Sequence, residues 1–233
     1  MAIDSPSSKR PDRALVVVAH GTDNPSGQAT VTWLRDRVAE LLPDVHVVDA
    51  YVDVQRPRLE EIVDSLVRQQ CRTVLVPALL STGYHVEVDI ARAVEQSELV
   101  TATPPLGPHP ILAAILQDRL LAAGVIPDGP VVLAAAGSSR PSGVAAVWRQ
   151  AELLAELRSG PVTAAFLSAA EPGVQDALDA AGGRVAVASY LLGHGAFHDR
   201  LRRHDVVVSE PIGADPRLAE LVRERYSRGK LSQ

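Results

Sequence analysis

Short apolar runs rich in valine alternate along the chain with longer stretches that mix apolar and charged residues. In the first half the apolar runs fall at residues 14–19, 45–51, 73–79 and 99–103, and we expect each to form a buried strand. The stretches between them are predicted to be helices that start near Gly27, Pro57, Val86 and Pro110. This alternation is typical of βα units around a parallel sheet, so the predicted fold class is α/β.

The second half of the chain repeats this order, with apolar runs at residues 131–136, 162–167, 184–192 and 205–209. Three segments align in the same order in both halves. They pair Gly21 with Gly137, Pro25 with Pro141, Pro57 with Pro172, Gly107 with Gly213, Pro110 with Pro216 and Arg119 with Arg225. Such a series indicates a duplication. We predict an N-terminal domain at residues 14–123 and a degenerate C-terminal repeat at 130–228, joined by a segment rich in Gly and Pro.

Composition removes several classes of function. The chain has 233 residues, of which 46% are hydrophobic and 22% charged, as in an ordinary globular protein. A net charge of -5 disfavours nucleic acid as a partner. No apolar stretch is long enough to span a bilayer, so we expect no membrane association. Residues 1–13 are polar and rich in Ser and Pro, which predicts a disordered leader rather than a secretory signal, and a cytoplasmic protein.

Ligands of open parallel sheets bind beyond the carboxyl ends of the strands, so the residues that follow each apolar run are the informative ones. His20 follows the first run and His85 follows the third. Neutral imidazole ligates divalent metal ions and accepts protons near pH 7. A single loop histidine is more often satisfied by backbone bonds, but two at matching strand exits favour a metal-handling site. The second half has Ala136 where the first has His20.

Several neighbours of these exits are candidates for supporting roles. Glu87 and Asp89 follow His85, where they either cap a helix or assist with the metal ion or a proton. His109 aligns with Asp215 at a predicted helix start and is interpreted as structural. The loop of the second half that contains His194 aligns His85 with Phe197 or, after a shift of one residue, with His198, which makes His198 an accessory candidate. The candidate substrate contacts are Ser81, Thr82, Gly83, Tyr84, Ser138, Ser139 and Arg140.

Three motifs together, VVVAHGT, YVDVQRP and LLSTGYHVEVDI, resemble the sirohydrochlorin chelatases of the class II chelatases. The resemblance runs from about Ala14 to Tyr226. It implies two duplicated α/β domains that face each other across a central cleft. It also implies insertion of Co²⁺ or Fe²⁺ into sirohydrochlorin without ATP, for cobalamin or sirohaem synthesis. The paired histidines of that family match His20 and His85, which are the predicted catalytic residues and metal ligands.

The resemblance implies no organic cofactor, since the divalent metal ion is a substrate, and it suits a monomer or a homodimer. Because Ala136 replaces a histidine, the sequence predicts a single insertion centre in the first half, with the second half as a wall of the cleft. One alternative is a non-catalytic tetrapyrrole or metal carrier of the same fold. Another is a generic α/β binding protein in which the histidines are incidental.

Overall fold

Two parallel four-stranded sheets, one from each half of the chain, form the frame of the protein. The computed structural model describes residues 12–81 and 83–230, with only the backbone for residues 84–86 and 230. The strand order is β2-β1-β3-β4 in the first sheet and β6-β5-β7-β8 in the second. The same order in both sheets, with every pairing parallel, confirms the predicted α/β class and duplicated sheets.

The elements alternate along the chain as the hydrophobic pattern predicts. The first half contains β1 (Arg13–Ala19), α1 (Pro25–Leu41), β2 (His46–Tyr51), α2 (Leu59–Arg68), β3 (Arg72–Pro77), α3 (Tyr84–Glu95), β4 (Val100–Ala102) and α4 (Pro110–Ala122). The second contains β5 (Val131–Ala135), α5 (Pro141–Ala155), β6 (Val162–Phe166), α6 (Val174–Ala181), β7 (Ala186–Tyr190), α7 (Ala196–Leu201), β8 (Val207–Val208) and α8 (Pro216–Lys230).

Local chemistry explains where the helices begin. Asn24 caps α1, because its side chain accepts hydrogen bonds from the backbone N–H groups of Ser26 and Gly27, and Pro25 suits the first helical position. The helix therefore starts two residues earlier than its predicted start at Gly27. His109 caps α4 by accepting a hydrogen bond from the Ile111 N–H at 3.2 Å, which confirms its structural role. The predicted leader overlaps the fold at Arg13, where β1 begins, and residues 1–11 lie outside the described part.

Each sheet is covered on both faces, which is why its strands are almost continuously apolar. Helices α2 and α3 cover one face of the first sheet, and α6 and α7 cover the corresponding face of the second. The other two faces share one continuous core that includes Leu15 and Val76 from the first sheet and Leu133 and Ala188 from the second. In the part of the chain that the structure describes, no helix is long and apolar enough to cross a bilayer.

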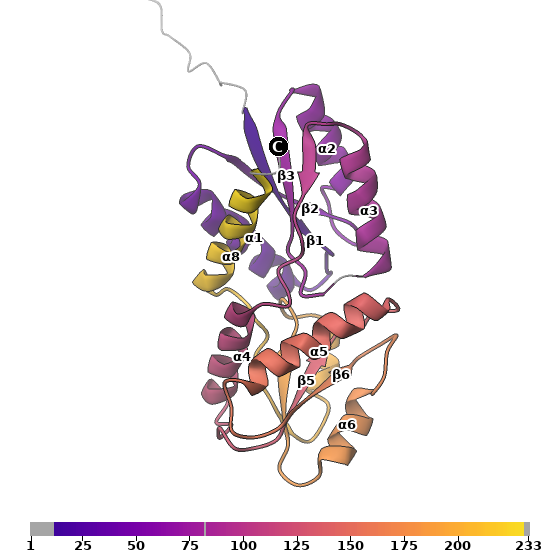
Figure 1. Ribbon diagram of the computed structural model, residues 1–233, viewed down its shortest axis with the longest axis vertical. Coiled ribbons are helices and arrows are strands. Elements are labelled where there is room, and N and C mark those ends of the chain that lie inside the picture. The colour runs from indigo at the N-terminus through magenta and orange to yellow at the C-terminus, as the bar shows by residue number, and fades with distance from the viewer. Residues whose placement is uncertain (1–11, 82, 231–233) are drawn as a thin grey trace, which may run out of the picture.

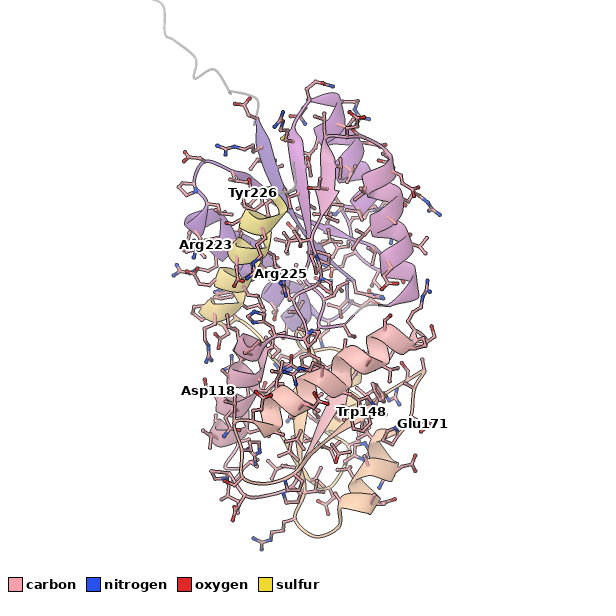
Figure 2. All side chains as sticks on the ribbon, in the orientation of Figure 1. Asp118, Trp148, Glu171, Arg223, Arg225 and Tyr226 are labelled. Atoms are coloured by element: carbon pink, nitrogen blue, oxygen red, sulfur yellow. The ribbon has the colours of Figure 1, made fainter. Side chains whose placement is uncertain are left out.

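The last helix of each half packs on the sheet of the other half. Helix α8 lies against α1 and β3 of the first sheet, whereas α4 lies against α5 and β7 of the second. Figure 1 shows α8 beside the upper sheet and α4 beside the lower one. In Figure 2, Arg225 and Tyr226 mark α8 in the upper half and Asp118 marks α4 in the lower half. The two halves have therefore exchanged their terminal helices.

Two arginines that align in the duplication make reciprocal contacts where the helices cross. Arg119 of α4 donates to the carbonyl of Ile212 at 3.0 Å, and Arg225 of α8 donates to the carbonyl of Leu106 at 3.4 Å. Each carbonyl stands one residue before the glycine that the alignment pairs, Gly107 or Gly213. The duplication is therefore visible in the contacts of the structure as well as in the sequence.

A close contact between the halves lies at Gly107, and it generates a first prediction. A Cβ atom at this position would lie 2.1 Å from the Tyr190 hydroxyl and 2.2 Å from the carbonyl of Leu80. These groups bond to each other at 2.7 Å in the buried interface, so neither can move away freely. We expect Gly107→Ala to lower the free energy of unfolding by about 1–3 kcal/mol or more, because overpacking displaces the interface. Urea unfolding followed by circular dichroism measures this.

The matched control is Gly129→Ala, where the new Cβ would have no neighbour closer than 3.5 Å. It should change stability far less than Gly107→Ala. Equal effects of the two substitutions would show that the interface tolerates the added methyl group.

A second prediction concerns the buried carboxylate at the crossing of α4 and α8. Asp215 accepts two hydrogen bonds from the Arg217 guanidinium at 2.9 and 2.8 Å, and Arg119 lies 3.6 Å away. The hydrogen bonds from Arg217 hold the pKa of Asp215 below its ordinary value. The unfolded chain therefore binds this proton more readily than the folded protein, so stability from Asp215 is full above the unfolded pKa of about 3.9 and is lost as the pH falls further.

We expect Asp215→Asn to cost about 1–3 kcal/mol at neutral pH, because it removes charged hydrogen bonds. The difference from the parent protein should shrink as the pH falls below about 4, since Asp215 of the parent is then protonated in the unfolded chain. Urea unfolding at neutral and at acidic pH measures both values. Asp44→Asn, at an exposed position, is the control and should change little at either pH. An Asp215→Asn effect that does not depend on pH would contradict the prediction.

Candidate functional site

Three neighbouring strands of the first sheet end beside one another, and each is followed by a residue that can ligate a metal ion. The order β2-β1-β3 places β1 between the other two. His20 follows β1 directly, Asp53 follows β2 by two residues, and His85 lies in the first turn of α3, after β3. The strands are parallel, so these three exits share one edge of the sheet. Asp53 therefore joins His20 and His85 as a third candidate ligand at this edge of the sheet.

The backbone brings the exits of β1 and β2 into direct contact. The Asp53 N–H donates to the carbonyl of His20 at 3.0 Å. Gly21 has a φ of 99°, and a Cβ atom on it would lie 2.3 Å from the Asp53 carbonyl oxygen. Only glycine permits this conformation and this approach. The aligned Gly137 has a φ of 106° and the same close relation to the carbonyl of Ser168, so both halves build this turn in the same way.

Polar side chains hold the loop after His20 in place. The Thr22 N–H donates to Gln55 Oε1 at 2.9 Å, which ties the loop after β1 to the loop after β2. Gln28 Nε2 donates to the carbonyl of Thr22 at 2.8 Å, which ties the same loop to α1. His20 itself is exposed at the edge of the sheet. The scaffold is therefore ordered while the imidazole faces solvent, as a site that receives a ligand requires.

Electrostatics favours a charged carboxylate beside His20. A hydrogen bond from the Val54 N–H, at 2.8 Å from Asp53 Oδ1, holds the pKa of Asp53 below its ordinary value, and the adjacent His20 and Arg58 act in the same direction. The Asp53 side chain is 65% exposed, so its oxygens remain accessible. An imidazole and a carboxylate side by side provide nitrogen and oxygen ligands for a divalent ion.

The start of α3 brings the predicted accessory residues to the same edge. Gly83 is the N-cap of α3, and Glu87 and Asp89 lie half-buried in its first turns. The side chains of Tyr84 and His85, and the whole of Thr82, lie outside the described residues. Ser81 is half-buried between β3 and the helix. A cavity of about 410 Å³ opens next to this segment, lined by Pro77, Leu79, Gly83, Glu87, Ile90, Ala91, Val94, Glu95, Ala102, Thr103 and Pro105.

The loop after β5 faces this edge from the second half. Arg140 Nε lies 3.8 Å from Glu87 Oε2, so the start of α5 meets the start of α3 across the boundary between the halves. In Figure 1, α3 stands above one end of α5. Ser138 is buried and accepts a hydrogen bond from the Arg140 N–H at 3.1 Å, whereas Ser139 is exposed. Arg140 and Glu87, both predicted site residues, are thus brought together.

His198 lies in a different group of residues. It is 1% exposed in α7, and its Nδ1 lies 3.0 Å from the Ser189 hydroxyl. Burial lowers its pKa, and the neighbouring His194 adds to this shift. Gly195 is the N-cap of α7, as Gly83 is of α3, so alignment on the caps pairs His85 with Phe197. His198 therefore gathers with His194 rather than with the His20 exit.

Asp53 is a candidate ligand that the sequence analysis does not name. His20 and His85 follow the first and third buried strands of the first half, and Asp53 follows the second. The second apolar run ends at Tyr51 and leads into Val52-Asp53. The rule that selects residues after buried strands, applied to this exit, finds the carboxylate.

Comparison with known proteins places these features in a family. The family model for CbiX matches residues 14–123 and again residues 130–229. The sirohydrochlorin cobaltochelatase of Methanothermobacter thermautotrophicus is 24% identical over 144 residues, which are 52% of this chain and 99% of that protein.

Two solved structures share the fold over nearly the whole chain. SirB from Bacillus subtilis with Fe³⁺ has a TM-score of 0.74 at 23% identity. The sirohydrochlorin chelatase SirB from Bacillus subtilis subspecies spizizenii, in complex with cobalt, has a TM-score of 0.76 at 21% identity. In each case the match covers 94% of this chain and 95% of the other.

Proposed function

The chain belongs to the CbiX family, and we propose that it is a sirohydrochlorin chelatase that inserts Co²⁺ or Fe²⁺ into the macrocycle without ATP. The observation that carries this proposal is the contact between the exits of β1 and β2, which sets His20 beside Asp53. The chelatase named among its relatives supports the choice of substrate. The ion is a substrate of the reaction rather than a resident cofactor.

The proposed reaction needs two groups of ligands in turn. His20, Asp53 and His85 first hold the divalent ion through two imidazoles and a carboxylate. The ion then passes to the four ring nitrogens, and the two pyrrole N–H groups of the ring release two protons. Imidazole nitrogens that the ion leaves are the nearest bases in this arrangement, and they accept protons near neutral pH. The charge balances, since one doubly charged ion enters as two protons leave.

We propose that the macrocycle lies between the two facing edges. The cavity beside Gly83 and Glu87 gives an apolar surface at the start of α3. Arg140 stands opposite, and its guanidinium suits the carboxylates of the ring. Ser81, Thr82, Tyr84 and Ser139 remain predicted contacts, and Glu87 and Asp89 remain predicted accessory groups. Since one chain supplies both edges, a monomer suffices for the reaction. A cytoplasmic location remains a prediction as well.

The donor set accepts both metals named in the proposal. Imidazole and carboxylate bind Co²⁺ and Fe²⁺ in related geometries, and availability in the cell contributes to selection. Both metals also occur among the similar proteins, because one is a cobaltochelatase and the two SirB structures contain iron or cobalt. We therefore propose either sirohaem or a cobalamin precursor as the end of the pathway.

A third prediction tests the proposed ligands. His20→Ala, Asp53→Ala and His85→Ala should each lower the rate of metal insertion by about 10²–10⁴-fold, because each removes a metal ligand or a base. The assay mixes the enzyme anaerobically with sirohydrochlorin and Co²⁺ or Fe²⁺ and follows the absorbance of the ring. Circular dichroism establishes that each variant is folded.

The control is His46→Ala, since His46 is exposed at the opposite end of β2 from Asp53. This variant should insert metal at the parent rate. If the parent protein does not exceed the rate of metal and macrocycle alone, the proposal that it is a chelatase is wrong. If the three ligand variants match the parent, the insertion site lies elsewhere.

A further inference from the structure

Three side chains that can ligate metal gather in the second half, outside the proposed insertion site. His194 lies in the loop after β7, His198 in α7, and Glu210 two residues after β8. One ligand atom from each residue lies within 4.8 Å of the other two. The exits of β7 and β8 are neighbours in the second sheet, so the fold itself brings these residues together.

The imidazole of His198 has one buried nitrogen atom without a hydrogen-bond partner, which indicates a ligand. Its side chain is buried, and Nδ1 is engaged by the Ser189 hydroxyl at 3.0 Å. Its Nε2 is also buried but has no hydrogen-bond partner. A buried polar atom left without a partner destabilises the folded state, so such atoms are uncommon in folded proteins. When Nδ1 carries the proton and donates it to Ser189, Nε2 presents the lone pair that a metal ion requires.

His194 and Glu210 complete the group. His194 Nε2 lies 3.1 Å from Glu210 Oε2, and its ring meets the ring of His198 edge to face, with centroids 4.9 Å apart. An ion pair between His194 and Glu210 accounts for these two residues alone. It leaves the Nε2 of His198 unexplained, whereas a shared ligand accounts for all three side chains.

From this arrangement we infer that His194, His198 and Glu210 form a second binding site for a divalent ion of the first transition row. Two imidazoles and one carboxylate suit Co²⁺, Ni²⁺, Fe²⁺ or Zn²⁺, whereas Mg²⁺ and Ca²⁺ prefer oxygen ligands alone. Three protein ligands leave at least one coordination position for water. The inference does not depend on the proposed chelatase activity.

The three ligand atoms must move closer together to bind one ion. Metal–ligand bonds of about 2.0–2.2 Å put the ligand atoms of a tetrahedral site about 3.4 Å apart, whereas these atoms lie within 4.8 Å of one another. Ser189 fixes His198, but the side chains of His194 and Glu210 are 35% and 62% exposed. These two can therefore move toward His198.

The second site lies close to the loop that carries His20. A Cβ atom on Gly27 of α1 would lie 2.4 Å from the carbonyl of His194. A Cβ atom on Gly195 would lie 3.3 Å from the hydroxyl of Thr22, which stands two residues after His20. The two sites are therefore neighbours across the boundary between the halves, yet they share no residue.

The experiment measures Co²⁺ binding by the full chain, without a histidine tag and without macrocycle. The starting protein is a triple variant that carries His20→Ala, Asp53→Ala and His85→Ala. It lacks the proposed insertion site, so only the second site remains, and it is the parent of the variants that follow. We expect this variant to bind one Co²⁺ per chain in equilibrium dialysis, with visible absorption bands typical of cobalt bound to nitrogen ligands. An excess of Mg²⁺ should not displace the ion, whereas Zn²⁺ should.

Added to this parent, His194→Ala, Glu210→Gln or His198→Asn should each weaken Co²⁺ binding at least about tenfold. Glu210 is exposed and His194 is half-buried, so we expect these two variants to fold, and circular dichroism checks all three. His204→Ala is the matched control, because His204 belongs to the same half but pairs with Gln175 instead. The inference is overturned if the parent variant binds no Co²⁺, if the folded ligand variants bind as tightly as their parent, or if His204→Ala weakens binding equally. None of these results bears on the chelatase assay.

Discussion

The exchange of α4 and α8 is the constraint on which the rest of the structure depends. Each sheet needs helices on both faces, and each half supplies only one of the two helices that cover its inner face. The other helix comes from the opposite half, so neither half buries its own core alone. The chain therefore folds around a shared core, and the two sheets are held with the carboxyl ends of their strands toward each other (Figure 1).

The central position of β1 then determines which residues can cooperate. A strand with parallel neighbours on both sides has its exit flanked by two others, and in the first sheet these exits carry Asp53, His20 and His85. The turn at Gly21 draws the first two together through a backbone hydrogen bond. The proposed set of metal ligands therefore depends on strand order and on one glycine.

Hydrophobic periodicity was sufficient to predict the strands and the strand exits, because these depend on local patterns. The duplication followed from three segments that align in the same order in both halves. The helix exchange was not predictable in the same way. The helix after Pro110 and the helix after Pro216 have similar amphipathic patterns, and a pattern does not specify which of two equivalent sheets it covers. The cluster around His198 was missed for a related reason. Its third member, Glu210, directly follows the predicted run at residues 205–209, but only the strand order, which places the exits of β7 and β8 side by side, shows that it meets His194 and His198.

The second half is more than a copy of the first that has lost its ligands. At the turn that both halves share, Ala136 occupies the place of His20 and Ser168 that of Asp53, so the ancestral pair of exits carries no metal ligand there. Alignment on the N-caps of α3 and α7 favours Phe197 over His198 as the counterpart of His85. The partners of His198 lie at the exits of β7 and β8. A duplicated scaffold offers each strand exit twice, so the second half can place metal ligands at exits other than those of the proposed insertion site. The His194, His198 and Glu210 cluster uses the exits of β7 and β8, which correspond to the exits of β3 and β4 in the first half, and it lies against the loop that carries His20.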